Sequence, residues 1–147
     1  MRFLFLFIFI IFSVPCAIGQ SYQSPPFEGK STAMVDITKI EITNKYTIVY
    51  MSCTTPEEFS FGGWACITRT AYILDVASNK RLKLIRSKGI PYCPNKYKFS
   101  GSHQTIKFKL YFPKINYDVR HIHIIEDLSN IANPFNFYNV YLKPLAH

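Results

Sequence analysis

Residues 104–112 read QTIKFKLYF, and this stretch decides the fold class of the chain. Side chains alternate between the two faces of a β-strand, so Ile106, Phe108 and Leu110 fall on one face while Lys107 and Lys109 fall on the other. Such alternation is typical of a strand with one buried side and one side in solvent. The stretch therefore predicts a half-buried strand.

Other segments show similar short runs of strand-forming residues between turn residues, and no segment has the sustained three-and-four spacing of a helix. In the first of them, Val35 and Ile37 share one face but Ile40 and Ile42 fall on the other, which predicts a β-bulge or a bend. Together about seven strands predict an antiparallel β-sandwich of immunoglobulin-like type. The other segments are residues 35–42, 46–53, 64–76, 80–86, 119–126 and 136–142. The predicted core consists of Ile48, Leu82, Leu84, Ile106, Phe108, Leu110, Ile122, Ile124, Tyr138, Val140 and Leu142.

Residues 1–19 have the order of a secretory signal peptide: a basic start, an apolar run over residues 3–12, and small or turn-forming residues at the end. The apolar run is too short to span a bilayer. We therefore expect cleavage before Gln20, export to the periplasm or the extracellular space, and no transmembrane anchor in the mature chain. Lipidation of Cys16 is an alternative, although Pro15 directly before it fits that processing poorly.

The rest of the chain divides into two parts. Residues 20–33 carry Pro25, Pro26 and Gly29, which predict a flexible leader. Residues 34–147 are long enough for one domain with a single core, the β-sandwich.

The chain is basic, with a formal net charge of +8, and such a charge favours anionic partners. Arg81, Lys83, Lys107 and Lys109 point outward on two predicted strands and would form one basic face if those strands shared a sheet. Binding of single-stranded nucleic acid would require aromatic side chains on the same face. Phe108 points to the opposite face, so we expect no nucleic-acid partner and interpret these residues as a solvated sheet face.

After signal cleavage Cys53, Cys66 and Cys93 remain, and an odd number of cysteines in an oxidising compartment suggests one disulfide and one free thiol. A hairpin centred between Phe59 and Ser60 would place Cys53 opposite Cys66. We therefore expect a Cys53–Cys66 disulfide, although the sequence alone leaves the connectivity open. Cys93 is then a loop thiol or a second candidate for the bridge.

Three aromatic residues, Phe59, Phe61 and Trp64, surround the Gly62-Gly63 pair next to the expected disulfide. Loops at the end of a β-sandwich often carry binding residues, and large aromatic side chains contribute strongly to contacts. These three residues are therefore the candidate contact loop for a protein or glycan ligand. The alternative is that they close the end of the hydrophobic core.

Signals for catalysis are weak. His121 and His123 share the outward face of one strand, but a zinc site needs a third ligand. His103, Asp118 or Glu126 would supply one only if the fold brought it close, so we interpret the pair as solvated. Adjacent carboxylates, Glu57-Glu58 and Glu126-Asp127, do not provide two carboxyl groups across a cleft. The chain also has no nucleophile elbow and no glycine-rich phosphate loop. We expect no catalytic residue, no metal site and no cofactor.

Several motifs together resemble a pattern that recurs in uncharacterised secreted proteins of Bacteroidetes. They are residues 72–75 (YILD), 79–84 (NKRLKL), 89–94 (GIPYCP), 108–113 (FKLYFP), 124–126 (IIE) and 136–140 (NFYNV). The similarity covers roughly residues 34–142 and departs from the pattern at Asn139, where glycine is usual, and at Leu82, where tyrosine is common. The resemblance implies export and a β-sandwich, and it carries over no catalytic residues.

Three hypotheses about function follow. The preferred one is an exported, non-enzymatic β-sandwich module that binds a protein or surface ligand through its end loops. The second is a small hydrolase that depends on a metal or a cysteine. The third is a structural component of the cell envelope.

Overall fold

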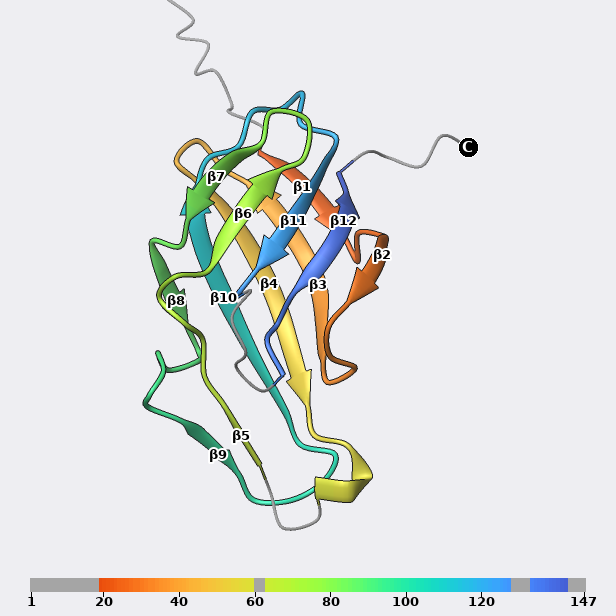
Figure 1. The fold of residues 1–147 in the computed structure, drawn as a ribbon, viewed down its shortest axis with the longest axis vertical. Helices are drawn as coiled ribbons and strands as arrows, with labels where there is room; N and C mark the ends of the chain where they lie inside the picture. The colour runs from red at the N-terminus through yellow and green to blue at the C-terminus, as the bar shows by residue number, and fades with distance from the viewer. Residues whose placement is uncertain (1–18, 60–62, 128–132, 143–147) are drawn as a thin grey trace, which may run out of the picture.

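A computed structural model describes residues 19–59, 63–127 and 133–142, which form an antiparallel β-sandwich (Figure 1). The predicted fold class is confirmed. The described residues form more strands than expected, because residues 20–30 also form strands and two of the predicted strands divide. Sheet A has the strand order β1 (Gln20–Gln23), β3 (Val35–Ile42), β4 (Tyr46–Thr54), β10 (Thr105–Pro113) and β8 (Arg86–Lys88). Sheet B has the order β2 (Phe27–Lys30), β12 (Phe137–Tyr141), β11 (His121–Ile125), β6 (Tyr72–Asp75) and β7 (Lys80–Lys83).

A third, two-stranded sheet lies at one end of the sandwich, together with a short 3₁₀ helix, η1 (Glu57–Phe59) (Figure 1). This small sheet pairs β5 (Gly63–Ala65) with β9 (Tyr97–Phe99). The predicted strand over residues 64–76 is thus wrong as one element, since its two halves become β5 and β6 in different sheets.

The chain crosses from one sheet to the other at both edges of the sandwich. Residues 80–86, predicted as one strand, divide into β7 in sheet B and β8 in sheet A. The crossing residues are bonded to both sheets: the Leu84 N–H donates to the carbonyl of Ala71, and the Ile85 N–H donates to the carbonyl of Tyr111, both at 2.8 Å. These bonds satisfy the backbone where the strand changes partners.

The predicted flexible leader over residues 20–33 is wrong. β1 pairs with β3 and β2 pairs with β12, so this segment forms one edge of each sheet. Tyr22 and Phe27 pack against the core from these strands, which explains why the segment is ordered despite its prolines and glycine. Residues 1–18, which carry most of the predicted signal peptide and Cys16, lie outside the described residues.

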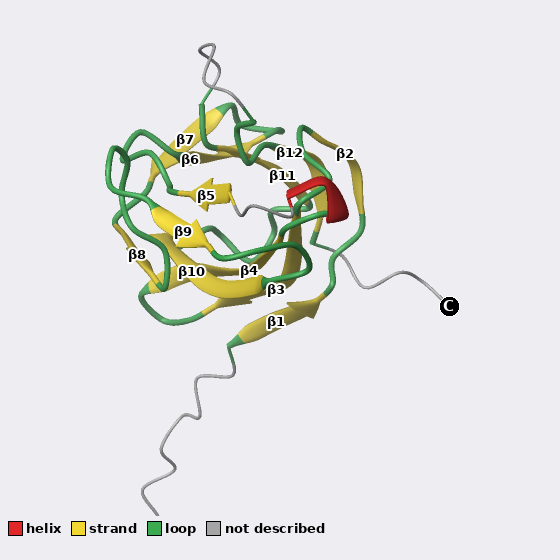
Figure 2. Cartoon of the chain, turned by 90° about the horizontal axis from the view of Figure 1, so that it is seen from below, coloured by secondary structure: helices red, strands yellow, loops and turns green. Residues whose placement is uncertain are grey.

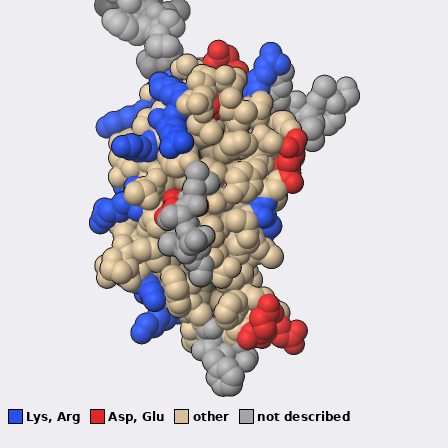
Figure 3. All heavy atoms as spheres, in the orientation of Figure 1, with Lys and Arg blue, Asp and Glu red and all other residues tan. Residues whose placement is uncertain are grey.

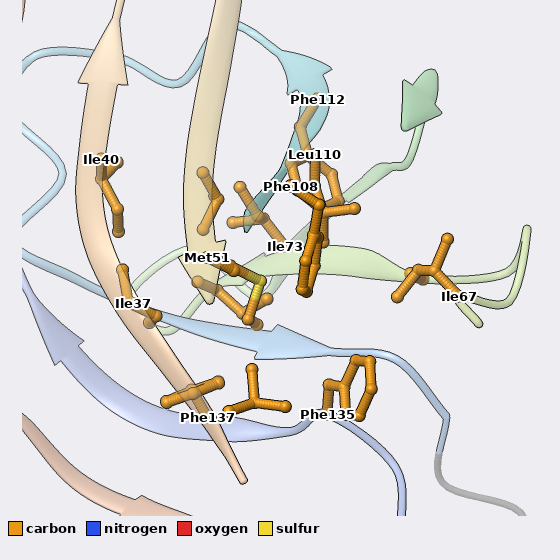
Figure 4. Packing of buried hydrophobic residues seen from close by; sticks show 14 of the residues in the cluster. Ile37, Ile40, Met51, Ile67, Ile73, Phe108, Leu110, Phe112, Phe135 and Phe137 are labelled. Carbon is orange, nitrogen blue, oxygen red and sulfur yellow. The ribbon is translucent and has the colours of Figure 1, made fainter. Parts of the chain in front are cut away.

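The core fills the space between the two sheets (Figure 4). Its predicted members Leu82, Ile106, Phe108, Leu110, Ile122, Ile124, Val140 and Leu142 are buried. Leu84 is only partly buried, because it lies at the crossing between the sheets. Ile48 is buried but belongs to the outer face of sheet A, since the inner face of β4 carries Val49 and Met51. The prediction that Ile48 faces the core was therefore wrong, because the other face of β4 points inward.

Two irregularities interrupt the alternation of side chains. The predicted bulge in β3 is confirmed by a shift of register between Ile37 and Lys39. A second shift occurs where β11 pairs with β12, and there Asn139 has a φ of 49°. This extra residue puts Phe137 fully inside and leaves Tyr138 37% exposed. The prediction of Tyr138 as a core residue was wrong because strict alternation fails across a bulge.

Candidate functional site: an apolar pocket at the end of the sandwich

Figure 2 views the sandwich from the end where β5, β9 and the short 3₁₀ helix lie. A pocket of about 590 Å³ opens at this end. Its walls come from loops and strand ends of both sheets and from the small third sheet. This size is within the range of small-ligand sites. The lining residues are Thr32, Met34, Cys53, Phe59, Gly63, Trp64, Ala65, Cys66, Thr68, Cys93, Pro94, Lys96, Glu126, Asn133 and Phe135.

Much of the wall is apolar. Met34 lies in the loop that joins β2 of sheet B to β3 of sheet A, and Phe135 lies just before β12 of sheet B. The ring of Phe135 lies 6.2 Å from that of the core residue Phe108. Trp64 of β5 is 50% exposed, and the Lys96 ammonium group lies 4.0 Å from the centre of its ring. The pocket therefore combines an apolar interior with an exposed aromatic ring and a cation at its edge.

The carboxylate of Glu126 is a buried polar group in this wall. One of its oxygens accepts the N–H of Thr68 at 3.0 Å, and the other accepts the N–H of Phe135 at 2.7 Å. Burial raises the pKa of Glu126, while these two hydrogen bonds act in the opposite direction. Glu126 thus joins two loops of the pocket, with one backbone N–H bonded to each carboxylate oxygen.

The structure corrects the disulfide prediction. Cys66 is bonded to Cys93, with 5.1 Å between their Cα atoms, and Cys53 is free and buried. The expected hairpin does not form, because β4 pairs with β3 and β10 while β5 pairs with β9. The Cys53–Cys66 prediction was therefore wrong, and the bond expected to restrain the aromatic loop is not there.

The actual disulfide restrains a different part of the same pocket. Next to it, the Ile67 N–H donates to the Pro91 carbonyl and the Cys93 N–H donates to the Ile67 carbonyl, both at 3.0 Å. The covalent bond and this short ladder hold residues 91–94 against the strand segment that follows Trp64. Cys53, Cys66 and Cys93 all line the pocket. Burial raises the pKa of Cys53 to about 11, so its thiol is protonated at neutral pH.

The structure brings together two of the three predicted contact residues. Phe59 and Trp64 both line the pocket, and Phe61 lies outside the described residues. Sequence reasoning missed Met34, Phe135 and the role of Glu126. Glu126 has the same parity as Ile122 and Ile124, and this signal indicates that its side chain points inward. Met34 and Phe135 lie in loops, where no such periodicity exists.

The predicted basic face is divided between the two sheets. Arg81 and Lys83 lie on β7 of sheet B, whereas Lys107 and Lys109 lie on β10 of sheet A. Lys and Arg side chains gather over the β7 side of the face shown in Figure 3. Phe108 points inward as expected, but Tyr50 and Tyr111 share the outer face with Lys109.

His121 and His123 lie on sheet B, and both side chains are partly exposed. The Nδ1 atom of His123 accepts the N–H of Asn139 at 2.9 Å. Nearby, Glu28 accepts hydrogen bonds from Tyr141 and Asn139, which hold its pKa below the usual value. Over residues 19–59, 63–127 and 133–142, no group of three or more His, Cys, Asp and Glu side chains is placed to hold a metal ion.

Within those same ranges, no helix is long and apolar enough to cross a membrane. The chain matches no family model, no curated protein and no solved structure.

Proposed function

We propose that the chain is an exported, non-enzymatic module that binds a protein partner by taking an apolar side chain of that partner into the end pocket. The observation that carries this proposal is the pocket of about 590 Å³ lined by Met34, Phe59, Trp64 and Phe135. Removing an apolar side chain from water in such a pocket favours association. The predicted signal peptide and the Cys66–Cys93 disulfide support export, because disulfides persist in oxidising compartments.

The character of the wall favours an apolar side chain over a sugar. A sugar needs several hydrogen-bonding groups, but both oxygens of Glu126 already accept backbone N–H groups. The hydroxyl of Thr68 donates to the Glu126 carbonyl at 2.9 Å. Trp64 and Met34, by contrast, are residue types that make large and adaptable apolar contacts at protein interfaces.

Two features support a role in binding rather than hydrolysis. The Cys53 thiol is protonated at neutral pH, whereas a cysteine nucleophile acts as the thiolate. Glu126 accepts a backbone N–H on each carboxylate oxygen, and these bonds give it a role in linking two loops of the pocket.

Trp64 provides the assay, because it is the only tryptophan of the chain and it lines the pocket. We expect the neutral dye N-phenyl-1-naphthylamine to bind at one equivalent, with energy transfer from Trp64 to the dye. Peptides selected from a random library on the wild-type protein should share one large apolar residue and should displace the dye. The variant Met34→Lys places a charge in the wall and should lose both dye and peptide binding.

Tyr97→Ala is the matched control. Tyr97 is an exposed aromatic residue on β9, directly across from Ala65, and it does not line the pocket. This variant should bind the dye and the selected peptides as the wild type does. If Met34→Lys also keeps both activities while remaining folded, or if selection yields peptides without an apolar residue, the proposal is wrong.

A further inference from the structure

A second hollow lies on the outer face of sheet A, away from the end pocket. It has a volume of about 330 Å³ and is lined by Thr38, Tyr50, Met51, Lys88, Gly89, Lys107, Phe108 and Lys109. Three of these eight residues are lysines, from the neighbouring strands β8 and β10. The hollow therefore has three cationic side chains in its wall, whereas the end pocket has only Lys96 among its described residues.

The strand register brings the three lysines together. Lys88 lies directly opposite Lys109 in the antiparallel pairing of β8 with β10, and Lys107 is two residues from Lys109 on the same face. Like charges directly opposite each other destabilise a sheet. An anion between them would remove that repulsion, so the arrangement indicates a site for a negatively charged group.

No carboxylate of the protein supplies that anion within residues 19–59, 63–127 and 133–142. The two ion pairs found there join Lys30 to Asp36 and Lys39 to Glu41. Glu41 is on the same face of sheet A, but Lys39 already holds it at 2.9 Å. Lys88, Lys107 and Lys109 form no ion pair with a described carboxylate, although the charge of Lys109 also acts on Glu41.

Gly89 shapes the hollow from the side of β8. Its φ is 90°, and a Cβ atom there would lie 2.7 Å from the carbonyl oxygen of Lys107. Only glycine allows the chain to turn so close to β10. β8 ends at Lys88, immediately before this turn, and the hollow lies beside the turn.

Cations lie next to tyrosine rings both in the hollow and beside it on the same sheet. Arg86 lies 4.0 Å from the ring centre of Tyr111, and Lys39 and Lys109 lie 4.0 and 4.8 Å from that of Tyr50. Lysine and arginine side chains of the protein itself therefore already cover the faces of these rings. A base or a neutral sugar would find little free ring surface on which to stack. A ligand on this face would be recognised by its negative charges.

We propose that this face binds an acidic polysaccharide, with a sulfate or carboxylate group in the hollow between Lys88, Lys107 and Lys109. A row of cations along neighbouring strands suits a polymer with repeated charges. Within the described part of the chain, the large exposed apolar residues lie outside β3, β4, β8 and β10. Ile85, directly before β8, is the one such residue beside this face, and a single apolar side chain is a weak anchor in a lipid surface. This proposal is independent of the end pocket.

The test compares two triple variants with the same loss of charge. Lys88→Gln/Lys107→Gln/Lys109→Gln removes the proposed site, and Lys80→Gln/Arg81→Gln/Lys83→Gln removes an equally dense group from β7 of sheet B. Binding of heparin, a sulfated polysaccharide, is measured by calorimetry at several salt concentrations. The first triple should weaken binding at least about tenfold and reduce its salt dependence, since charge contacts release counterions. The β7 triple variant should change the affinity by less than about twofold, because its residues belong to sheet B and do not line the hollow.

The proposed site is wrong if both triple variants weaken heparin binding equally, or if the first triple variant does not weaken it. Single-stranded DNA or vesicles of anionic lipid that bind as tightly as heparin, and only when the three lysines are present, would overturn the polysaccharide assignment. NMR of the wild-type protein tests the same site without any substitution. Heparin should shift the amide signals of Gly89 and Lys109 and leave those of β7 unchanged. The reverse pattern would refute the site.

Discussion

The Cys66–Cys93 disulfide should contribute strongly to stability, and its removal by Cys66→Ala/Cys93→Ala is the most informative perturbation of the fold. The bond closes a loop with a sequence separation of 27 residues. On the chain-entropy model, a loop of that length gives about 3.5 kcal/mol of stabilisation. The effect should be concentrated at the end of the sandwich, because β5 and β9 pair only with each other.

Urea unfolding, followed by far-UV circular dichroism, measures this loss. Cys53→Ala is the control, since it removes a buried sulfur without opening a loop. It should cost less than the double variant, about 1 kcal/mol for the small cavity that remains. Peptide mapping without reduction should also show Cys66 joined to Cys93. A loss below about 1 kcal/mol in the double variant would refute the entropic reasoning, and a Cys53–Cys66 peptide would refute the connectivity.

Three further predictions concern single residues. Phe108→Ala should lower the free energy of unfolding by about 3–5 kcal/mol in denaturant titrations, because Phe108 is buried in the core; a change near zero would mean that its face is reversed. Burial raises the folded-state pKa of Glu126, so its contribution is fully present below the usual value of 4.5 and is lost as pH rises through the raised pKa. Relative to the variant Glu126→Gln, the wild type should therefore become less stable over that pH range, and a parallel pH dependence of the two unfolding curves would contradict this. Asn139→Val should destabilise the protein by about 1–2 kcal/mol in the same titrations, while Asn139→Gly should be nearly neutral. The reason is the φ of 49° at this position, which suits glycine and asparagine but strains a β-branched residue. Equal effects of the two substitutions would show that the backbone there is not restrained.

The sandwich could be predicted from alternation because strands with one buried face impose a period of two on the sequence. The prediction worked for residues 104–112, where β10 pairs along its whole length with β4 and no irregularity intervenes. The prediction failed at residues 80–86, where the chain passes from one sheet to the other. Alternation shows which side chains point inward, but it does not show to which sheet a segment belongs. It failed again at Tyr138, because the bulge at Asn139 depends on pairing with β11.

Part of the candidate pocket could also be predicted. Phe59 and Trp64 were recognised as a cluster because they are close in sequence. Met34 and Phe135 lie far from them in the chain, and only the packing of the two sheets brings them to the same pocket. The disulfide was missed for a related reason: the pairing of β5 with β9 is long-range, so local hairpin geometry gave the wrong partner for Cys66.

The central claim is that the end pocket accepts an apolar group, and the methionine methyl groups test it most directly. Met34 lines the pocket, Met51 is buried in the core, and Met1 belongs to the predicted signal peptide. In a protein with ¹³C-labelled methionine methyl groups, N-phenyl-1-naphthylamine should shift the Met34 signal in a saturable manner and leave the Met51 signal in place. A Met34 signal that does not move at saturating dye, or one that moves only together with that of Met51, would contradict the account.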